Sequence, residues 1–167
     1  AYALGLKPRE EAEEGFDVVI RVSRDLPGNG VGRGLAPVRR KLCATPEYFE
    51  RHGVPNVPQD LTVHNCLDYI HSGEPGLWRF RGPEGEIAVP VSGRLRINDD
   101  EALSQAVLGG LGLALLPTFI IGQDLQAGRL RAVLSEYIPI DQHVHALYLP
   151  TRHLPAKVRT FIDFLVN

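Results

Sequence analysis

The stretch that decides the fold is residues 94–117, RLRINDDEALSQAVLGGLGLALLP. It opens with Arg94–Ile97, where polar and apolar residues alternate as they do in a strand. Asn98 follows as a candidate N-cap, with Glu101 at the capping-box position three residues later. The next apolar residues recur at helical spacing and predict an amphipathic helix.

The second half of this stretch argues against a dinucleotide site. Gly109 and Gly110 end the helix, and the apolar run Leu113–Leu116, closed by Pro117, is typical of a buried strand. A dinucleotide-binding fingerprint requires a strand, then glycines, then a helix. Here the glycines follow a helix and precede a strand, so they are predicted to be a connection.

Outward from this stretch, strands and helices continue to alternate, which predicts an α/β fold. The run Phe16–Ile20 has no polar alternation and is predicted to be a strand covered on both faces. The glycine-dense segment 27–34 is predicted to be a turn, because no phosphate-binding Lys-Ser/Thr pair follows it. Further strands are predicted at 38–44, 66–70, 129–134 and 143–149, with a hairpin joining 78–80 to 87–89.

Three further helices have clear start signals. Thr45 is a predicted N-cap, with Pro46 at the first helical position and Gly53 as terminator. Thr118 is predicted to cap a helix that runs through Leu125. The last helix is predicted to start at Pro155, and its apolar stripe comprises Val158, Phe161, Ile162, Leu165 and Val166.

The composition limits the classes of function. The chain has 167 residues, of which 44% are apolar and 23% charged, the balance of a folded globular protein. Its formal net charge of -2 gives no basic excess for holding nucleic acid. The longest apolar run is far short of a membrane span, and no signal peptide opens the chain, so a cytoplasmic location is expected.

Candidate reactive groups are few, and no catalytic set is expected. Cys43 and Cys66 are predicted to be buried thiols, since two cysteines make no disulfide framework or metal motif. His143 and His145 would share one strand face, but no third ligand is near, so neither a metal nor another cofactor is expected. His52, His64 and His153 are predicted to lie in loops or on the surface. Trp78 is predicted to cover the apolar face of the hairpin.

Four segments, in this order and spacing, resemble the effector-binding domain of LysR-type transcriptional regulators. The segments are 14–21, EGFDVVIR; 42–48, LCATPEY, with 51–55, RHGVP; 109–117, GGLGLALLP; and 157–165, KVRTFIDFL. The resemblance runs from about Glu11 to Asn167. It implies two α/β lobes of the type II periplasmic-binding-protein kind, joined by two crossover strands, with a small effector bound between them.

The resemblance also predicts how the chain divides. Residues 1–36 would be a remnant of lobe I and the first crossover, 37–142 lobe II, and 143–167 the second crossover and the helix that returns to lobe I. The early strands of lobe I, the winged helix-turn-helix that binds DNA and the linker helix of the family are expected to lie outside this chain. Lobe I is therefore expected to be incomplete.

Local features and the resemblance together nominate the effector site. Arg21 follows a predicted strand and could pair with a carboxylate, while Asn98 and Thr118 open helices where backbone N–H groups favour an anion. Pro117 is included with Thr118 because it directly precedes that helix start, and the resemblance adds Tyr69, Ile70, His71, Ile97 and Asp99. Simpler roles stay open, namely a surface ion pair for Arg21 and helix caps for Asn98 and Thr118.

The charges at the start of the predicted helix conflict with an anionic ligand. Asp99, Asp100 and Glu101 would repel a bound carboxylate, so either they point away from the ligand or the effector is neutral or cationic.

The hypothesis is a ligand-sensing domain of a dimeric or larger DNA-binding regulator, with a small molecule as partner and an organic acid as one candidate. DNA would be a partner only through the absent N-terminal domain, and no membrane contact is expected. The alternatives are an extracytoplasmic solute-binding protein of the same fold and an enzyme on this fold. The second needs a convergent acid, base or nucleophile set, which the sequence does not offer.

Overall fold

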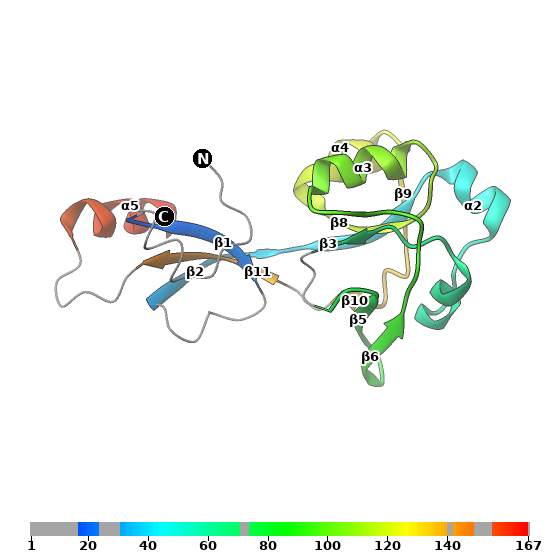
Figure 1. The fold of residues 1–167 in the computed structure, drawn as a ribbon, viewed down its shortest axis with the longest axis horizontal. Helices are drawn as coiled ribbons and strands as arrows, with labels where there is room; N and C mark the ends of the chain where they lie inside the picture. Colours follow the sequence, from blue (N-terminus) through cyan, green and yellow to red (C-terminus); the bar gives the residue numbers. More distant parts are fainter. Residues whose placement is uncertain (1–16, 24–30, 71–73, 140–141, 149–154, 167) are drawn as a thin grey trace. The chain divides into compact units, whose positions relative to one another are not determined.

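The computed structural model of this chain describes residues 17–23, 31–70, 74–139, 142–148 and 155–166 (Figure 1). Its contacts divide the chain into two compact units, Ala1–Val38 with Asp141–Asn167 (unit 1) and Arg39–Ile140 (unit 2). Both units combine strands with helices, which confirms the predicted α/β class. The exact lobe boundaries stay a prediction. Within the described ranges, no helix is both long and apolar enough to cross a membrane.

Unit 1 is a three-stranded antiparallel sheet with one helix. Its elements are β1 (Val19–Ser23), β2 (Val31–Val38), β11 (Gln142–Tyr148) and α5 (Ala156–Val166). The strand order is β1-β11-β2, so β11 is central. Helix α5 packs on this sheet through Val158 and Ile162, which form a small core with Ala146.

Two predictions for unit 1 are wrong. The first strand spans Val19–Ser23 and alternates in burial, with Ile20 42% and Val22 37% exposed, so only one of its faces is covered. Gly32 and Gly34 belong to strand β2, so the predicted turn is wrong for residues 31–34, whereas 27–30 lie outside the described residues. The pairing of β2 with β11, made far along the chain, overrides the local turn preference of glycine.

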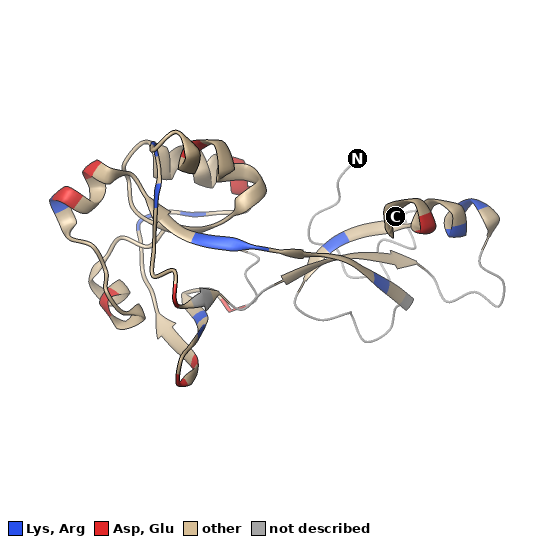
Figure 2. Cartoon of the chain, turned by 180° about the vertical axis from the view of Figure 1, so that it is seen from behind, with Lys and Arg blue, Asp and Glu red and all other residues tan. Residues whose placement is uncertain are grey.

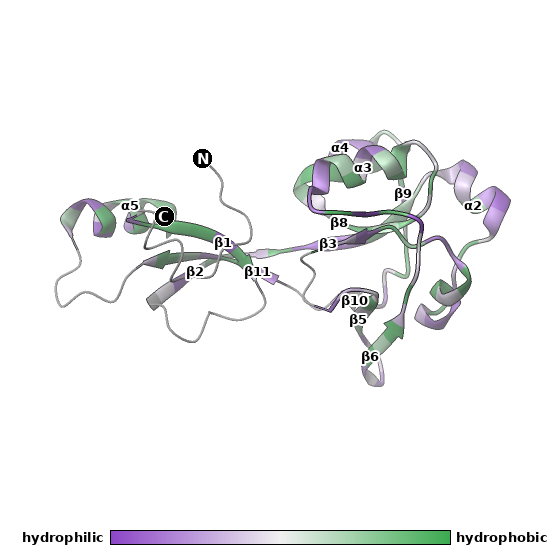
Figure 3. Ribbon diagram, in the orientation of Figure 1, coloured by the Kyte–Doolittle hydropathy of each residue, from purple (hydrophilic) through white to green (hydrophobic). Residues whose placement is uncertain are grey.

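Helix α5 is amphipathic, and Figure 3 shows hydrophobic and hydrophilic residues mixed along it. Its predicted start is confirmed, because the N–H of Val158 donates to the carbonyl of Pro155. The predicted stripe is only partly buried. Val158 and Ile162 are in the core, whereas Phe161 is 45% and Val166 41% exposed.

Unit 2 holds the remaining elements. In chain order they are β3 (Arg40–Ala44), α2 (Pro46–His52), η1 (Pro58–Val63), β4 (Asp68–Tyr69), β5 (Leu77–Gly82), β6 (Gly85–Pro90), β7 (Arg96–Ile97), α3 (Asp100–Leu108), β8 (Ala114–Pro117), α4 (Thr118–Gln126), β9 (Arg131–Val133) and β10 (Ile138–Pro139). The predicted hairpin is confirmed as β5 and β6, paired from Leu77 with Pro90 to Gly82 with Gly85.

The central sheet of unit 2, β8-β3-β9, is covered on both faces. Alternate residues of β3 enter different cores: Leu42 and Ala44 pack with Tyr48 of α2, while Cys43 packs with Leu103 of α3. Figure 1 shows α3 and α4 together over one face of β8 and β3. This double cover explains why the strand within Leu113–Leu116 is apolar without alternation, as predicted.

The helix starts of unit 2 confirm one prediction and correct two. The Thr45 side chain accepts a hydrogen bond from the Tyr48 N–H at 3.2 Å, and Gly53 ends α2 at φ 82°. Asp99, and not Asn98, caps α3, because its Oδ1 accepts from the Ala102 N–H at 2.7 Å. Thr118 does not cap α4, since it is the first helical residue and Pro117 stands at the cap.

Candidate functional site

The carboxyl ends of two short strands meet in unit 2. β4 and β7 are parallel, with Tyr69 opposite Ile97, and the N–H of Ile70 donates to the carbonyl of Ile97 at 2.9 Å. Asn98 and Asp99 follow directly and lead into α3. Five of the predicted site residues are therefore adjacent at one edge, where the carboxyl ends of strands and a helix start coincide.

The β3 strand connects Pro117 and Thr118, the other two predicted site residues among the described residues of unit 2, to this edge. Arg40 of β3 is opposite Pro117 of β8, and the N–H of Thr118 donates to the carbonyl of Arg39 at 2.9 Å. Figure 2 shows the basic segment in which β3 begins. The guanidinium of Arg40 stands over the ring of Tyr69, with Cζ 5.7 Å from the ring centroid.

An ion pair that the sequence analysis missed lies at the centre of this edge. Nη2 of Arg40 is 3.6 Å from Oδ2 of Asp100, and the side chains are only 12% and 20% exposed. The available signal was the basic run 39–41 at the start of a strand whose later residues, Leu42–Ala44, are apolar. That signal identifies a cation at the strand end, but its partner is distant in sequence and only the fold reveals it.

The pair keeps unused hydrogen-bonding capacity. Nε of Arg40 and Oδ1 of Asp100 are buried atoms with no hydrogen-bond partner within the described part of the chain. Burial raises the pKa of Asp100; Asp99 adds to the increase and Arg40 opposes it. A small polar molecule could accept from Arg40 and donate to Asp100, because an arginine only donates and a carboxylate only accepts.

The acidic residues at the start of α3 have separate roles. Oδ1 of Asp99 is used in capping the helix, and Asp100 faces Arg40. Glu101 is exposed. Two of the three carboxylates thus have local partners, which reduces the repulsion expected from the sequence. Burial, with Asp100 and then Asp99, raises the pKa of Tyr69 against the effect of Arg40, so its hydroxyl stays protonated at neutral pH.

The remaining two predicted site residues, Arg21 and His71, are not part of the described edge of unit 2. Arg21 belongs to unit 1, within β1 and opposite His145, and not after the end of its strand as expected. His71 lies outside the described residues. The involvement of both in ligand binding stays a prediction.

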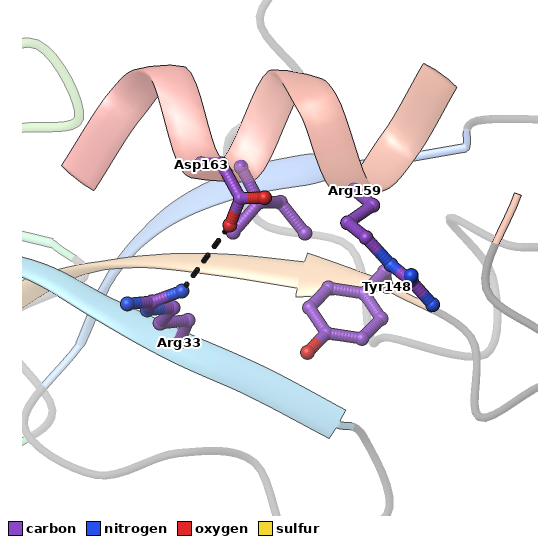
Figure 4. Close-up of a pocket in the computed structure, with 5 residues that line it drawn as sticks. Arg33, Tyr148, Arg159 and Asp163 are labelled. Carbon is purple, nitrogen blue, oxygen red and sulfur yellow. Dashed lines mark ion pairs between the residues drawn. The ribbon is translucent and has the colours of Figure 1, made fainter. Parts of the chain in front are cut away.

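A shallow pocket of about 260 Å³ occurs within unit 1. Figure 4 shows Asp163 of α5 facing Arg33 of β2, with Tyr148 and Arg159 beside them. The Arg33–Asp163 ion pair is 3.6 Å long, and both side chains are about half exposed, so it contributes little stability. No role is predicted for these residues from the sequence.

The burial and contacts of the cysteines and histidines favour structural roles for them. Cys43 and Cys66 are both fully buried, as predicted, and burial raises the pKa of each thiol to about 12. His143 and His145 share a strand face as expected, with ring centroids 6.0 Å apart. His64 is not a surface residue, because it is 8% exposed and hydrogen-bonded to the buried Tyr48 hydroxyl.

Comparison with known proteins identifies the family to which this chain is similar. The model of the LysR substrate binding domain matches residues 6–167. DmlR, an HTH-type transcriptional regulator of Escherichia coli K12, is 37% identical over 153 residues, which are 91% of this chain and 50% of that protein. LtrA of Klebsiella pneumoniae, a probable HTH-type transcriptional regulator, is 32% identical over 95% of this chain and 52% of its own length.

A solved structure agrees with both. The full-length Vibrio cholerae virulence activator AphB, a member of the LTTR protein family, aligns with a TM-score of 0.78 and 28% identity, covering 98% of this chain and 54% of AphB. The chain thus spans about half the length of the curated relatives it matches. These relatives favour a regulator over the extracytoplasmic solute-binding alternative.

Proposed function

We propose that this chain, which belongs to the LysR substrate-binding domain family, is the small-molecule-sensing part of a DNA-binding transcriptional regulator. The observation that carries the proposal is the polar edge of unit 2, where Tyr69, Asn98 and Thr118 lie around the Arg40–Asp100 pair. No role in catalysis is proposed for these residues. DNA binding would belong to a segment of the full regulator outside this chain.

The ligand we propose is a small molecule that offers a hydrogen-bond acceptor and a donor. An acceptor such as a carboxylate would take the unused Nε–H of Arg40, and a donor would satisfy Oδ1 of Asp100. The ring of Tyr69 supplies an apolar surface beside the guanidinium. Organic acids that also carry a donor are the first class to test, with neutral amides as the second.

The signalling step we propose is a change in the relative population of two arrangements of units 1 and 2. A ligand bound at the Arg40 edge of unit 2 would stabilise the arrangement for which it has the higher affinity. It can shift the population only by its difference in affinity for the two. In the full regulator, which we expect to be a homo-oligomer, that shift would alter the spacing of the DNA-binding segments.

Isothermal titration of the chain with small organic acids, and with amides and amines of matched shape, tests this proposal. We expect at least one organic acid or amide to bind, and Asn98→Ala and Thr118→Ala each to weaken it. Gln105→Ala, on the exposed face of α3 away from its start, is the matched control. Binding that both site variants leave unchanged would place the ligand elsewhere.

The enzyme alternative is tested in the same titration. The bound compound is incubated with the chain and then quantified by proton NMR. A sensing domain returns the compound unchanged, whereas conversion that depends on the chain would overturn the proposal.

A further inference from the structure

A second hollow lies in unit 2, at the opposite ends of the strands that form the candidate site. It measures about 430 Å³ and is lined by Tyr48, His52, Val63, Asn65, Arg94 and Leu111. Asn65, Arg94 and Leu111 precede β4, β7 and β8 in the chain. β4 is parallel to β7, and the Cys66–Leu113 bridge next to β4 and β8 is also parallel, so this hollow is at the amino ends of all three.

The floor of the hollow is held in place by Asn65. Its Nδ2 donates to the carbonyl of Leu111, its Oδ1 accepts from the N–H of Arg94 at 2.9 Å, and its own N–H donates to the Tyr48 hydroxyl at 3.2 Å. One side chain and its backbone thus connect four segments of the chain. A site with a fixed floor loses little conformational freedom when it binds a ligand.

The walls combine an apolar surface with an available cation. Val63 is 86% and Leu111 51% exposed, so both offer apolar surface to a ligand in the hollow. The guanidinium of Arg94 has no ion-pair or hydrogen-bond partner among the described residues. His52 stands edge-on to the Tyr48 ring, with centroids 4.5 Å apart, and is itself exposed.

We propose that this hollow is a second ligand site, for a small carboxylate with an apolar or aromatic body. The planar guanidinium of Arg94 matches a carboxylate in a bidentate pair, and Val63 with Leu111 would cover the apolar body. A purely apolar ligand would leave Arg94 unpaired, and inorganic phosphate would make no use of the apolar wall. This site is separate from the proposed function, because it shares no residue with the Arg40 edge.

Titration of the chain with benzoate tests the proposal, with benzamide as the uncharged analogue and inorganic phosphate as the anion without an apolar body. We expect benzoate to bind and Arg94→Gln to weaken it by at least about tenfold, the size of one lost charge-assisted hydrogen bond. Arg81→Gln, the same charge change at an exposed position of β5, is the control. Val63→Glu should abolish binding, because it places a carboxylate beside the ligand.

Several results of this titration would overturn the proposal of a second ligand site. Absence of benzoate binding, equal binding of benzamide or phosphate, or an equal loss in Arg81→Gln would each overturn the proposal. A loss in Asn98→Ala with none in Arg94→Gln would place benzoate at the Arg40 edge instead. Because Arg94 and Val63 are exposed, the variants are expected to fold, and their circular dichroism melting curves verify this.

Discussion

The indole Nε1 of Trp78 donates a 2.9 Å hydrogen bond to Oδ1 of Asp68, and both side chains are buried. The same carboxylate accepts from the N–H of Tyr69 at 3.0 Å and from that of Gly76 at 2.9 Å. Asp68 therefore ties the β5–β6 hairpin to β4, directly behind the candidate site. The hairpin cover predicted for Trp78 has a polar anchor that the sequence did not indicate.

Replacing this carboxylate should destabilise unit 2. Asp68→Ala leaves three donors without their acceptor, and each buried unsatisfied donor costs about 1–3 kcal/mol. We expect the free energy of unfolding, measured by urea titration, to fall by at least about 2 kcal/mol. Glu86→Gln, which removes an exposed partner of Arg79, should change it by less than about 1 kcal/mol. Similar losses in both variants would contradict the anchoring role of Asp68.

His64 should make stability depend on pH. The Tyr48 hydroxyl accepts from the Asn65 N–H and is also hydrogen-bonded to Nδ1 of His64, at 3.1 Å. Burial, and then the nearby His52, lower the pKa of His64 below its ordinary 6.5, against the effect of Asp60. The folded state therefore keeps His64 neutral at a pH where the unfolded state has bound a proton.

The sign of that dependence follows from linkage. Well above pH 6.5 His64 is neutral in both states, and as the pH falls through 6.5 the unfolded chain takes up the proton first. The free energy of unfolding should then decrease until the pH passes the lower pKa of the folded state. Urea titrations between pH 8 and 5 should show a smaller decrease in His64→Gln than in the parent chain, and identical slopes would refute this.

The two thiols should be unreactive in the folded protein. Because burial raises the pKa of both Cys43 and Cys66 to about 12, almost no thiolate is present at neutral pH, and the thiolate is the nucleophile. Labelling with iodoacetamide should be very slow in buffer and rapid in urea. Mass spectrometry counts the labelled sites, and fast labelling without urea would show that a thiol is accessible.

Gly93 and Gly112 leave no room for a side chain, so substitution of either should destabilise the fold. A Cβ at Gly93 would overlap the carbonyl oxygen of Cys66, and one at Gly112 would overlap that of Asn65. Gly93→Ala and Gly112→Ala should therefore lower the melting temperature markedly, since backbone must move. Gly122 of α4 has nothing within 4 Å of its Cβ position, so Gly122→Ala should stabilise the helix by up to about 1 kcal/mol. Stable Gly93 and Gly112 variants would contradict the close packing.

Removing the Asp99 side chain that caps α3 should cost more stability than removing its neighbour Asn98. Asp99→Ala removes the acceptor for the Ala102 N–H and should cost about 1 kcal/mol in the free energy of unfolding. Asn98→Ala removes an exposed side chain that does not cap and should cost much less. Urea titration of both variants compares these losses directly. An equal loss in the free energy of unfolding would contradict the assignment of Asp99 as the cap.

The sequence by itself determined the features whose cause is local. The Thr45 cap, the Gly53 stop, the β5–β6 hairpin and the Gly109–Gly110 connection depend on neighbouring residues, and the structure has them as predicted. The buried state of Cys43 and Cys66 follows in the same way from their apolar neighbours. The ordered segments that resemble the LysR family also carry enough information to identify it.

Only the tertiary structure decided what depends on residues far apart in the chain. Asp99 and Asn98 are nearly equal as caps, so the packing of α3 chooses between them. The exposed face of β1 depends on which residues cover it, and the burial of His64 depends on Tyr48. The Arg40–Asp100 ion pair connects the first residue of β3 with the first residue of α3, which are far apart in the sequence. Local sequence sets the preference of each segment, whereas charge pairing and burial are properties of the surfaces that the fold brings together.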